Sequence, residues 1–526
     1  MRFNIFPYFV GFFFLKILAH FALSYYNITH IKTLHIDFIF FLYNNNLKFK
    51  EQDLQHLFKT SIPYGLLSTL CALFIGCVQI PQQNSLTQNL NPTFNNISFI
   101  STQPHSKPQK TSPLEQIQLL FYDTNLHHLL DIATKKNLNL QITSTKILQA
   151  QSQLKSAWSL LFPQVNGTLN ANTNTTTTQS RSYNTQIGAT LSWELDLFSR
   201  LRYVKNAKES LYEKSLQDLE NAKITLFAEI ATLYFTLLET KQNLILTEEN
   251  IIYYQEALEL TRLKVENGLL DSTELFEKQN LLTEEQNTLE RLKSIQEESK
   301  NALLILLDSP SLPIEIPQIL PTPKTHFNLA NLPADTLLSR PDIKAALFNL
   351  HAQIYTKANA KASLFPIISI SANINEILDS TTQASGNLAW GLASSLSAPI
   401  LNRTQLTQNY FLQDALLKES YLTLQKSLKS AFTEIENASF HTKSVQLQLK
   451  NSQKRLQNAQ NYYDFSLNRH SIGLIDTLEH TLNCASFNNA KKSLNTTQSE
   501  NLKALIALYK AFGGNLNLQK ESYANN

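Results

Sequence analysis

Two copies of one short pattern organise this sequence: SLLFPQVNGTLNA at residues 159–171 and SLFPIISISANI at residues 363–374. In each copy a proline ends a segment of helical composition, because proline cannot continue a helix. Apolar and polar residues then alternate with period two, which predicts a strand. A second alternating segment follows each copy. The four predicted strands contain the apolar series Val165 to Ala171, Ile187 to Trp193, Ile368 to Ile374 and Leu388 to Leu396.

Other markers repeat at nearly the same offset, which indicates an internal duplication. The prolines of the two copies are 203 residues apart, Trp193 and Trp390 are 197 apart, and Gly268 and Gly473 are 205 apart. We interpret residues 114–309 and 334–515 as two repeats. Five prolines between Pro310 and Pro323 predict an extended linker over 310–333. Residues 516–526 form a C-terminal tail.

Long segments without helix breakers surround the strands. We expect helices over 114–160 and 334–363 before the two strand pairs. Residues 200–265 contain no Pro or Gly, and their apolar residues follow a heptad seam, as do those from Tyr421 onward in the second half. Each long helix turns at a glycine and returns, as helix 273–306 or helix 476–513. About 65 residues make a helix ~100 Å long, which is a rod and not a catalytic pocket.

Four strands cannot close a barrel alone. An open edge in lipid would leave backbone groups unpaired, at a cost of several kcal/mol each. Either the strands face water, or several chains combine them. Three chains would supply twelve strands, which is an even number and wide enough for a lumen.

The N-terminal region differs in composition from the rest of the chain. Residues 1–60 hold 12 of the 30 Phe residues. Lys59, the short apolar stretch 65–73 and a small residue directly before Cys77 predict a signal peptide over 59–76. The Cys77 thiol then accepts acyl chains, palmitate among them. We interpret residues 1–58 as an upstream extension from a start assigned too early, and 77–113 as a linker. The alternative is an uncleaved apolar segment with an incidental Cys.

Composition excludes several classes of protein. Charged residues make up 17% of the 526 residues, and only 11 are Gly. Mean hydropathy is −0.19, which argues against a polytopic helical membrane protein. Residues 77–526 hold 39 residues of each charge sign, which argues against nucleic-acid binding. We find no catalytic motif and no metal-ligand spacing, so we expect no enzyme activity, cofactor or metal.

The motif LSWELDLFSR at residues 191–200 resembles that of the outer membrane efflux protein family, the TolC-like channels, and in particular their lipid-anchored NodT-type branch. Arg340-Pro341-Asp342-Ile343 together with Leu364-Phe365-Pro366 resembles the matching signature of the second half. Ala398-Pro399-Ile400-Leu401-Asn402 stands where the family has a Pro-Leu/Ile-Phe-Asp-Gly-Gly motif; Arg403 and Thr404 replace its glycines. The resemblance covers about residues 114–515.

The resemblance implies a mixed α+β membrane protein. Three chains form a twelve-stranded β-barrel in the bacterial outer membrane, with four strands per chain, continued by a long α-helical barrel in the periplasm. Such a homotrimer is a passive exit duct for drugs and other compounds. Its implied partners are a periplasmic adaptor protein and an inner-membrane pump of the resistance-nodulation-division (RND) type, with no nucleic acid.

The predicted tips of the helical hairpins carry the candidate site residues. Each tip has Gly, then Asp at the third position after it and Glu at the sixth. The glycines suit a tight turn with positive φ, and the aspartates suit helix N-caps. The resemblance implies gate carboxylates at the Glu positions; the alternative is a solvated helix face. The tip turns are Gly268 with Asp271 and Gly473 with Asp476, and the gate candidates are Glu274 and Glu479.

Apolar residues beside the two glycines are candidate adaptor contacts: Leu269, Leu270, Leu474 and Ile475. The alternative role for these four residues is packing within the trimer. Two other functions remain open at this stage. One is the outer membrane channel of a type I protein-secretion system, and the other is a coiled-coil lipoprotein without a pore. Alternating strands with one Trp in each half argue against a simple rod.

Overall fold

The computed structural model describes residues 112–175, 181–317, 319–321, 335–379 and 387–516. The segments interpreted as the extension 1–58, the signal peptide 59–76 and nearly all of the linker 77–113, with Cys77, lie outside the described residues, as do 322–333 and 517–526. Within the described ranges no helix combines the length and the apolar character that a membrane crossing requires.

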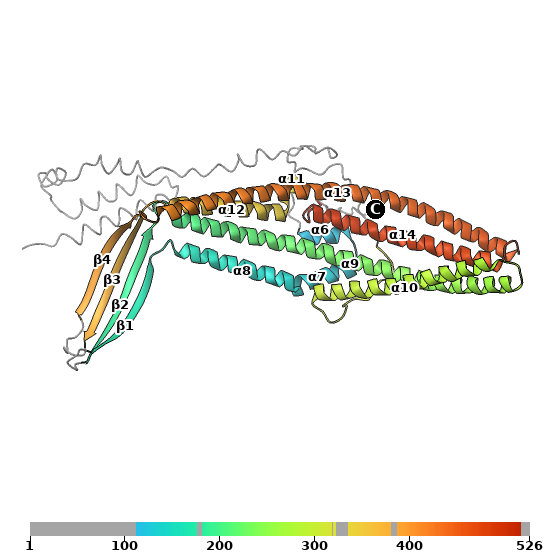
Figure 1. The fold of residues 1–526 in the computed structure, drawn as a ribbon, viewed down its shortest axis with the longest axis horizontal. Helices are drawn as coiled ribbons and strands as arrows, with labels where there is room; N and C mark the ends of the chain where they lie inside the picture. Colours follow the sequence, from blue (N-terminus) through green and yellow to red (C-terminus); the bar gives the residue numbers. More distant parts are fainter. Residues whose placement is uncertain (1–111, 176–180, 318, 322–334, 380–386, 517–526) are drawn as a thin grey trace, which may run out of the picture. The chain divides into compact units, whose positions relative to one another are not determined.

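Each half of the chain has the same order of elements: short helices, two strands, a very long helix and a return helix (Figure 1). The first half contains α6 Pro113–Leu120, α7 Thr124–Lys136, α8 Leu138–Ser159, β1 Gln164–Thr175, β2 Arg181–Leu195, α9 Arg200–Glu266 and α10 Ser272–Leu307. The second half contains α11 Asp335–Ser339, α12 Pro341–Ala362, β3 Ile367–Asp379, β4 Asn387–Ser397, α13 Arg403–Ser471 and α14 Thr477–Ala511.

The expectation of one helix over 114–160 is wrong, because polar caps divide this segment into three helices. The Asp123 carboxylate accepts hydrogen bonds from the backbone N–H of Asn125 and Leu126, which starts α7. The Asn137 side chain accepts from the Leu140 N–H and starts α8. Both side chains satisfy amides that a new helix leaves unpaired. The segment 334–363 is also divided, since Pro341 begins α12 immediately after α11.

The strands form one antiparallel sheet in the order β1-β2-β3-β4, which confirms the four predicted strands. The two halves meet in this sheet, because β2 pairs with β3 and Trp193 lies opposite Ile370. Edge strands β1 and β4 contain no charged residue and pair on one side only within the described chain. Indole Nε1 of Trp193 donates to the Leu161 carbonyl at 3.1 Å, which attaches the sheet to the end of α8.

The long helices agree with the prediction from the heptad seam. Helix α9 has 67 residues and α13 has 69, each about 100 Å at 1.5 Å per residue. The return helices α10 and α14 have 36 and 35 residues. Helix α9 packs against α8, α10, α12 and α14, so it is the central element of the helical region.

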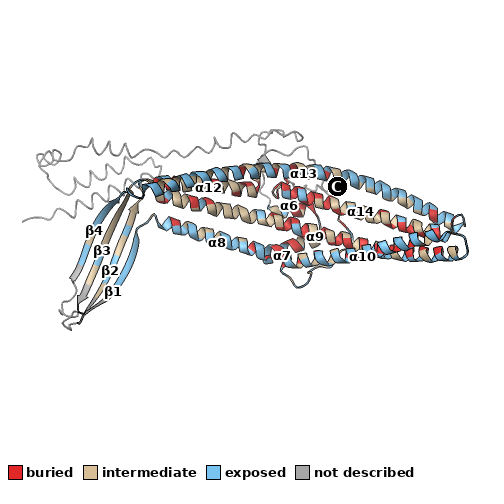
Figure 2. Cartoon of the chain, in the orientation of Figure 1, coloured by how far each residue is buried: buried red, intermediate tan, exposed pale blue. Residues whose placement is uncertain are grey.

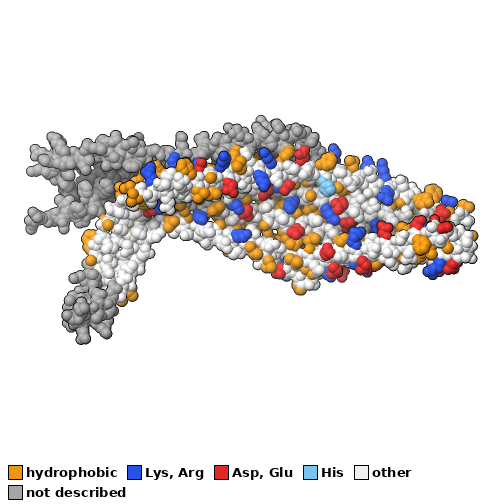
Figure 3. All heavy atoms as spheres, viewed as in Figure 1, with side chains coloured by type: hydrophobic (Ala, Val, Ile, Leu, Met, Phe, Trp, Pro, Cys, Tyr) orange, Lys and Arg blue, Asp and Glu red, His pale blue; other side chains and the backbone are white. Residues whose placement is uncertain are grey.

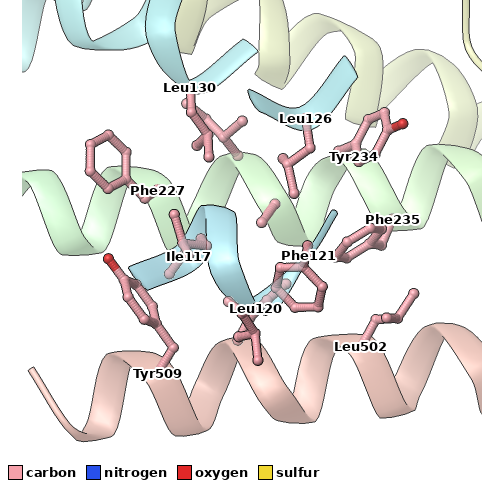
Figure 4. Packing of buried hydrophobic residues seen from close by; sticks show 14 of the residues in the cluster. Ile117, Leu120, Phe121, Leu126, Leu130, Phe227, Tyr234, Phe235, Leu502 and Tyr509 are labelled. Atoms are coloured by element: carbon pink, nitrogen blue, oxygen red, sulfur yellow. The ribbon is translucent and has the colours of Figure 1, made fainter. Parts of the chain in front are cut away.

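The main hydrophobic core lies where the short helices α6 and α7 pack against the middle of α9 and the end of α14 (Figures 2 and 4). Phe121 of the α6–α7 connection packs edge-on against Phe235 of α9, with ring centroids 5.0 Å apart. Tyr234 is fully buried, and its hydroxyl donates to the Asp123 carboxylate at 2.8 Å. The carboxylate that caps α7 therefore also fixes α7 on α9.

A buried arginine connects three segments beside this core. The Arg340 guanidinium donates to Asp342 and Glu434 at 2.7 and 2.8 Å and to the Ala511 carbonyl at 2.5 Å. Because two carboxylates compensate its charge, the buried guanidinium does not remain unpaired. Gly513 has a φ of +63°, and a Cβ there would lie 2.8 Å from the Arg340 side chain. The Arg340-Pro341-Asp342 motif thus joins the start of α12 to α13 and to the end of α14.

Candidate functional site

The turn between α9 and α10 and the turn between α13 and α14 lie at the same end of the helical region (Figure 1). We call residues 264–276 the first tip and 469–481 the second tip. Their backbones are nearly identical. Gly268 and Gly473 have φ of +70° and +72°. Gly268 N–H donates to the Val265 carbonyl at 2.9 Å, and Gly473 N–H donates to the His470 carbonyl at 3.0 Å.

The next amide in each tip completes the same helix ending. Leu269 N–H donates to the Lys264 carbonyl and Leu474 N–H to the Arg469 carbonyl, both at 2.8 Å. This paired arrangement is the Schellman motif, which requires a left-handed residue at the glycine position. Among the described residues, and apart from the two residues that flank each glycine, no heavy atom lies within 4 Å of a Cβ built on Gly268 or Gly473. The glycines are therefore required by backbone conformation and not by lack of space.

Asp271 and Asp476 are the N-cap residues of α10 and α14. The Asp271 carboxylate accepts from Thr273 N–H at 2.8 Å, and Asp476 accepts from Glu479 N–H at 2.9 Å. The hydrogen bond from the Thr273 amide lowers the pKa of Asp271. The pKa of Asp476 is also lowered, first by the Lys264 ammonium and then by the Glu479 amide. Both carboxylates stay charged to a lower pH than usual, because backbone amides, and at Asp476 also the Lys264 ammonium, donate hydrogen bonds to the charged form.

A salt bridge joins the two tips. The Lys264 ammonium at the end of α9 contacts the Asp476 carboxylate that caps α14. The same carboxylate thus stabilises the start of one hairpin's return helix and connects it to the other hairpin. Asp271 at the first tip forms no corresponding ion pair within the described residues. The tips therefore differ in their connections although their backbones agree.

The two gate candidates also differ. Glu274 Oε2 lies 3.3 Å from Nζ of Lys278, one turn along α10, and Lys278 also contacts Glu277 at 2.9 Å. Glu479 is exposed and takes part in no ion pair among the described residues. Position 483, the equivalent of Lys278, is Asn483. The negative charge of Glu479 is thus compensated less than that of Glu274.

Three of the four apolar adaptor candidates are accessible and one is not. Leu269 and Leu474 are 72% and 64% exposed, and Leu270 is half-buried. Ile475 is only 7% exposed, so the described chain itself covers this side chain and it is unsuited to direct contact. Two large apolar side chains at the tips were not anticipated: Ile472 and Phe276 are 69% and 67% exposed. Ile472 directly precedes Gly473, so inspection of the residue before the turn could have found it.

A cluster of aromatic and polar side chains at the second tip was also missed. The imidazoles of His470 on α13 and His480 on α14 stack with ring centroids 4.8 Å apart and an interplanar angle of 10°. Tyr463 stacks on Phe487 just beyond them, with centroids 5.1 Å apart. His470 lies in the last turn of α13 and His480 in the first turn of α14, and two histidines on either side of one turn are the signal in the sequence that could have indicated the pair.

The sheet presents an apolar surface of its own. Large apolar side chains on the strands are strongly exposed in the single chain, among them Val165, Leu169, Trp390, Leu392 and Leu396. In the view of Figure 3, charged side chains are scattered over the helices and nearly absent from the strands. Exposed apolar side chains on strands that carry few charged side chains suit a lipid environment.

In the described ranges, no group of three or more His, Cys, Asp and Glu side chains lies close enough to hold a metal ion. The Cys484 side chain is buried, and burial raises the pKa of its thiol, which makes it a poor nucleophile.

Comparison with known proteins identifies the class. The sequence model of the outer membrane efflux protein family matches residues 129–308 and 332–514, which together exceed half of the chain. This chain belongs to the outer membrane efflux protein family. The resemblance of the 191–200 and 340–343 motifs is confirmed. Residues 309–331 separate the two matches and contain the five prolines from Pro310 to Pro323.

Individual relatives agree with this assignment. The chain is 28% identical over 416 residues to the solvent efflux pump outer membrane protein SrpC of Pseudomonas putida, covering 76% of this chain and 87% of the relative. It is 23% identical over 406 residues to the toxin and drug export protein A of Aggregatibacter actinomycetemcomitans, covering 76% of this chain and 89% of that protein.

Solved structures show the same fold. The Campylobacter jejuni CmeC outer membrane channel superposes with a TM-score of 0.68 at 24% identity, covering 81% of this chain and 94% of CmeC. The outer membrane protein VceC of Vibrio cholerae gives a TM-score of 0.66 at 19% identity, with 76% of this chain and 98% of VceC covered. The mostly helical chain with a small sheet therefore has the fold of TolC-like channels.

Proposed function

We propose that this protein is the outer membrane channel of a tripartite efflux system and acts as a passive exit duct. The observation that carries the proposal is the four-stranded sheet with two open, uncharged edges and an apolar surface. Such edges are not tolerated in lipid unless they pair. Three copies would pair β4 of each chain with β1 of the next and close a barrel of twelve strands.

The long helices then form the periplasmic part of the duct. Helices α9 and α13 run from the sheet to the tips, and the helices of three chains together form an α-helical coiled-coil barrel. We interpret the two halves as a tandem repeat, since both have the order strand, strand, long helix, return helix. We propose the boundaries 114–309 and 334–515 for the two repeats and 310–333 for the linker between them.

Delivery to the duct requires partners at the tips. We infer a periplasmic adaptor protein that contacts the exposed Leu269, Leu270 and Leu474, and an inner-membrane pump of the RND type behind it. Ile475 supports the turn from inside and is not part of this surface. SrpC is named as a component of a solvent efflux pump, which supports a pump partner but does not define the exported compounds.

Gating is proposed to involve the tip carboxylates. A ring of three Glu479 side chains, one from each chain, would bring exposed carboxylates together without compensating ammonium groups, and such a ring attracts cations. Glu274 contributes less, because Lys278 offsets its charge. Attachment to the membrane is proposed through acylated Cys77 after removal of the signal peptide 59–76, and lipid chains would add to the anchoring by the barrel.

Imaging of purified protein tests the duct directly. Protein with a C-terminal tag, purified in detergent, should appear by electron microscopy as a threefold hollow cylinder with a helical part ~100 Å long. Solid rods or monomers would contradict the closure argument and favour the coiled-coil lipoprotein. Crosslinking from Leu474→Cys in cells then identifies the partner; a protein-exporting pump in place of an RND pump would indicate type I secretion.

A further inference from the structure

The second tip contains a histidine pair whose geometry does not fit two charged rings. His470 and His480 lie face to face across the α13–α14 turn, with ring centroids 4.8 Å apart. Two imidazolium ions at this separation would repel each other, and among the described residues no carboxylate forms an ion pair with either ring. Face-to-face stacking is therefore compatible with at most one positive charge.

Both nitrogens of His480 have neutral partners. Nδ1 lies 3.0 Å from the Ser466 hydroxyl, and Nε2 lies 3.7 Å from the Cys484 sulfur. Asn483 Nδ2 donates to the Ser466 oxygen at 3.0 Å, so the Ser466 hydroxyl proton is available for Nδ1. Nε2 then carries the ring proton and directs it at Cys484. With this assignment each donor and acceptor around the ring has a partner, and His480 is neutral.

The charged and titratable groups around the pair come from three helices. On α14 they are Asp476 and Cys484, and on α13 Tyr463 lies with its ring centroid 6.1 Å from that of His480. On α9 they are Lys264, which holds Asp476, and Glu256, whose charge acts on His480. His470 Nε2 also lies 3.3 Å from the hydroxyl of Thr477 at the start of α14.

We propose that the His470–His480 stack is a proton-sensitive latch that keeps the second tip packed at neutral pH and loosens it when His480 becomes protonated. Loosening of residues 472–480 would also move Asp476 away from Lys264 and release the connection between the hairpins. The latch rests on the proposed function in one respect only, namely that the tips are the gate of the duct. The local pH response itself belongs to a single chain.

The direction of the effect follows from linkage. Burial and the neighbouring His470 lower the pKa of His480 in the packed tip, and Glu256 opposes them only in part. A loosened tip, in which His480 is hydrated, has the ordinary value near 6.5. The loosened tip therefore binds more protons as pH falls below about 6.5, and the packed tip loses stability over that range. Above about pH 6.5 His480 is neutral in both the packed and the loosened tip, so a further rise in pH does not change the balance between them.

The first tip provides an internal control. At the offset of 205 residues, His470 and His480 correspond to Val265 and Leu275, which do not titrate. The two tips share the Schellman turn and the Asp N-cap. The double variant His470→Val with His480→Leu thus gives the second tip the residues of the first.

Hydrogen–deuterium exchange of the full-length protein in detergent tests the latch. Rates are compared at pH 7.5 and 5.5 after correction for intrinsic exchange. We expect protection of 472–484 to fall at least about threefold at pH 5.5 in the wild type. Protection of 267–279 should stay constant, and the double variant should lose the response. An unchanged second tip, or an equal change in both tips, would overturn the proposal.

The native Cys484 supplies a second measurement that needs no variant. Its reaction with dithiodipyridine, relative to a free reference thiol at the same pH and mapped by mass spectrometry, should accelerate at pH 5.5, because its contact with His480 is lost. A constant relative rate would contradict the latch. Imaging of the same sample judges the duct separately. If the threefold cylinder is absent, the proposed function fails, whereas exchange at 472–484 still decides the latch.

Discussion

The two tips of this chain have the same backbone and different side-chain chemistry. Both end a long helix in a Schellman turn at a glycine with φ near +70° and begin a return helix at an aspartate. The first tip balances the charge of Glu274 locally through Lys278. The second depends on Lys264 of the other hairpin and on a stacked histidine pair. The two tips thus share the conformation of the turn, while their different side chains decide which change in conditions can loosen each turn.

Replacement of the glycines should have the largest effect and should act equally at the two tips. Gly268→Val and Gly473→Val force a branched residue into the left-handed region, which costs about 1–2 kcal/mol or more. Hydrogen–deuterium exchange in the last turns of α9 and α13 should rise in each variant at its own tip. Asn at the same positions, which tolerates this region better, should cost less; equal effects of Val and Asn would show that conformation is not decisive.

Loss of the N-cap residue should destabilise the two tips to different extents. Asp476→Ala removes both the hydrogen bond to the α14 amide and the partner of Lys264, and should destabilise the second tip by about 1 kcal/mol. Asp271→Ala removes a cap alone, so the first tip should respond less. Local exchange rates of α10 and α14 measure both changes. Asp476→Asn, which retains a capping acceptor without the charge, is the matched control. Its effect on local exchange should be smaller than that of Asp476→Ala and larger than that of Asp271→Ala.

Strong acid should distinguish the same pair of carboxylates. Lys264 and the Glu479 amide lower the pKa of Asp476, so its stabilising contribution is complete above the unfolded value near 3.9 and disappears as pH falls through the lowered value. Lys264→Met should weaken this dependence at the second tip by up to about 1 kcal/mol and leave the first tip unaffected. A pH series below 5, carried out in the double variant His470→Val with His480→Leu so that the histidine latch does not contribute, monitors it.

The smallest effect is expected on ion selectivity. Glu479→Gln should reduce the preference for cations in planar-bilayer recordings, because three uncompensated carboxylates are lost from the trimer. Glu274→Gln should change it less, since Lys278 already offsets that charge. If Glu479→Gln leaves selectivity unchanged, the gate assignment is wrong. If both variants act equally, the difference between the tips does not extend to the lumen.

Periodicity predicted most of the fold. The strands after Pro163 and Pro366 and the long helices α9 and α13 have patterns that extend over ten or more residues, so local errors do not obscure them. The breaks at Asp123 and Asn137 were missed, because a capping side chain outweighs helix propensity at a single position. The match to the family added what periodicity could not, namely the place of the chain in the outer membrane.

The site was predicted less completely, because the differences between the two tips arise from contacts between residues far apart in the sequence. Gly268, Gly473 and the two aspartates lie where the turn pattern indicated. The burial of Ile475, the Lys264–Asp476 ion pair and the histidine stack depend on which helix faces are brought together at the tips. No spacing within one helix specifies such contacts. Whether Glu479 faces the lumen stays a prediction.

The pairing of β2 with β3 has a consequence for biogenesis. Trp193 and Ile370 are opposite each other in the sheet although the whole first helical hairpin and the linker separate them in sequence. Contacts between such distant segments form slowly, because a long loop must close first. At about 5–20 residues per second of synthesis, strands β1 and β2 wait many seconds for their neighbours. We therefore expect the helices to form first and the chain to remain incompetent for membrane insertion until its second half is complete.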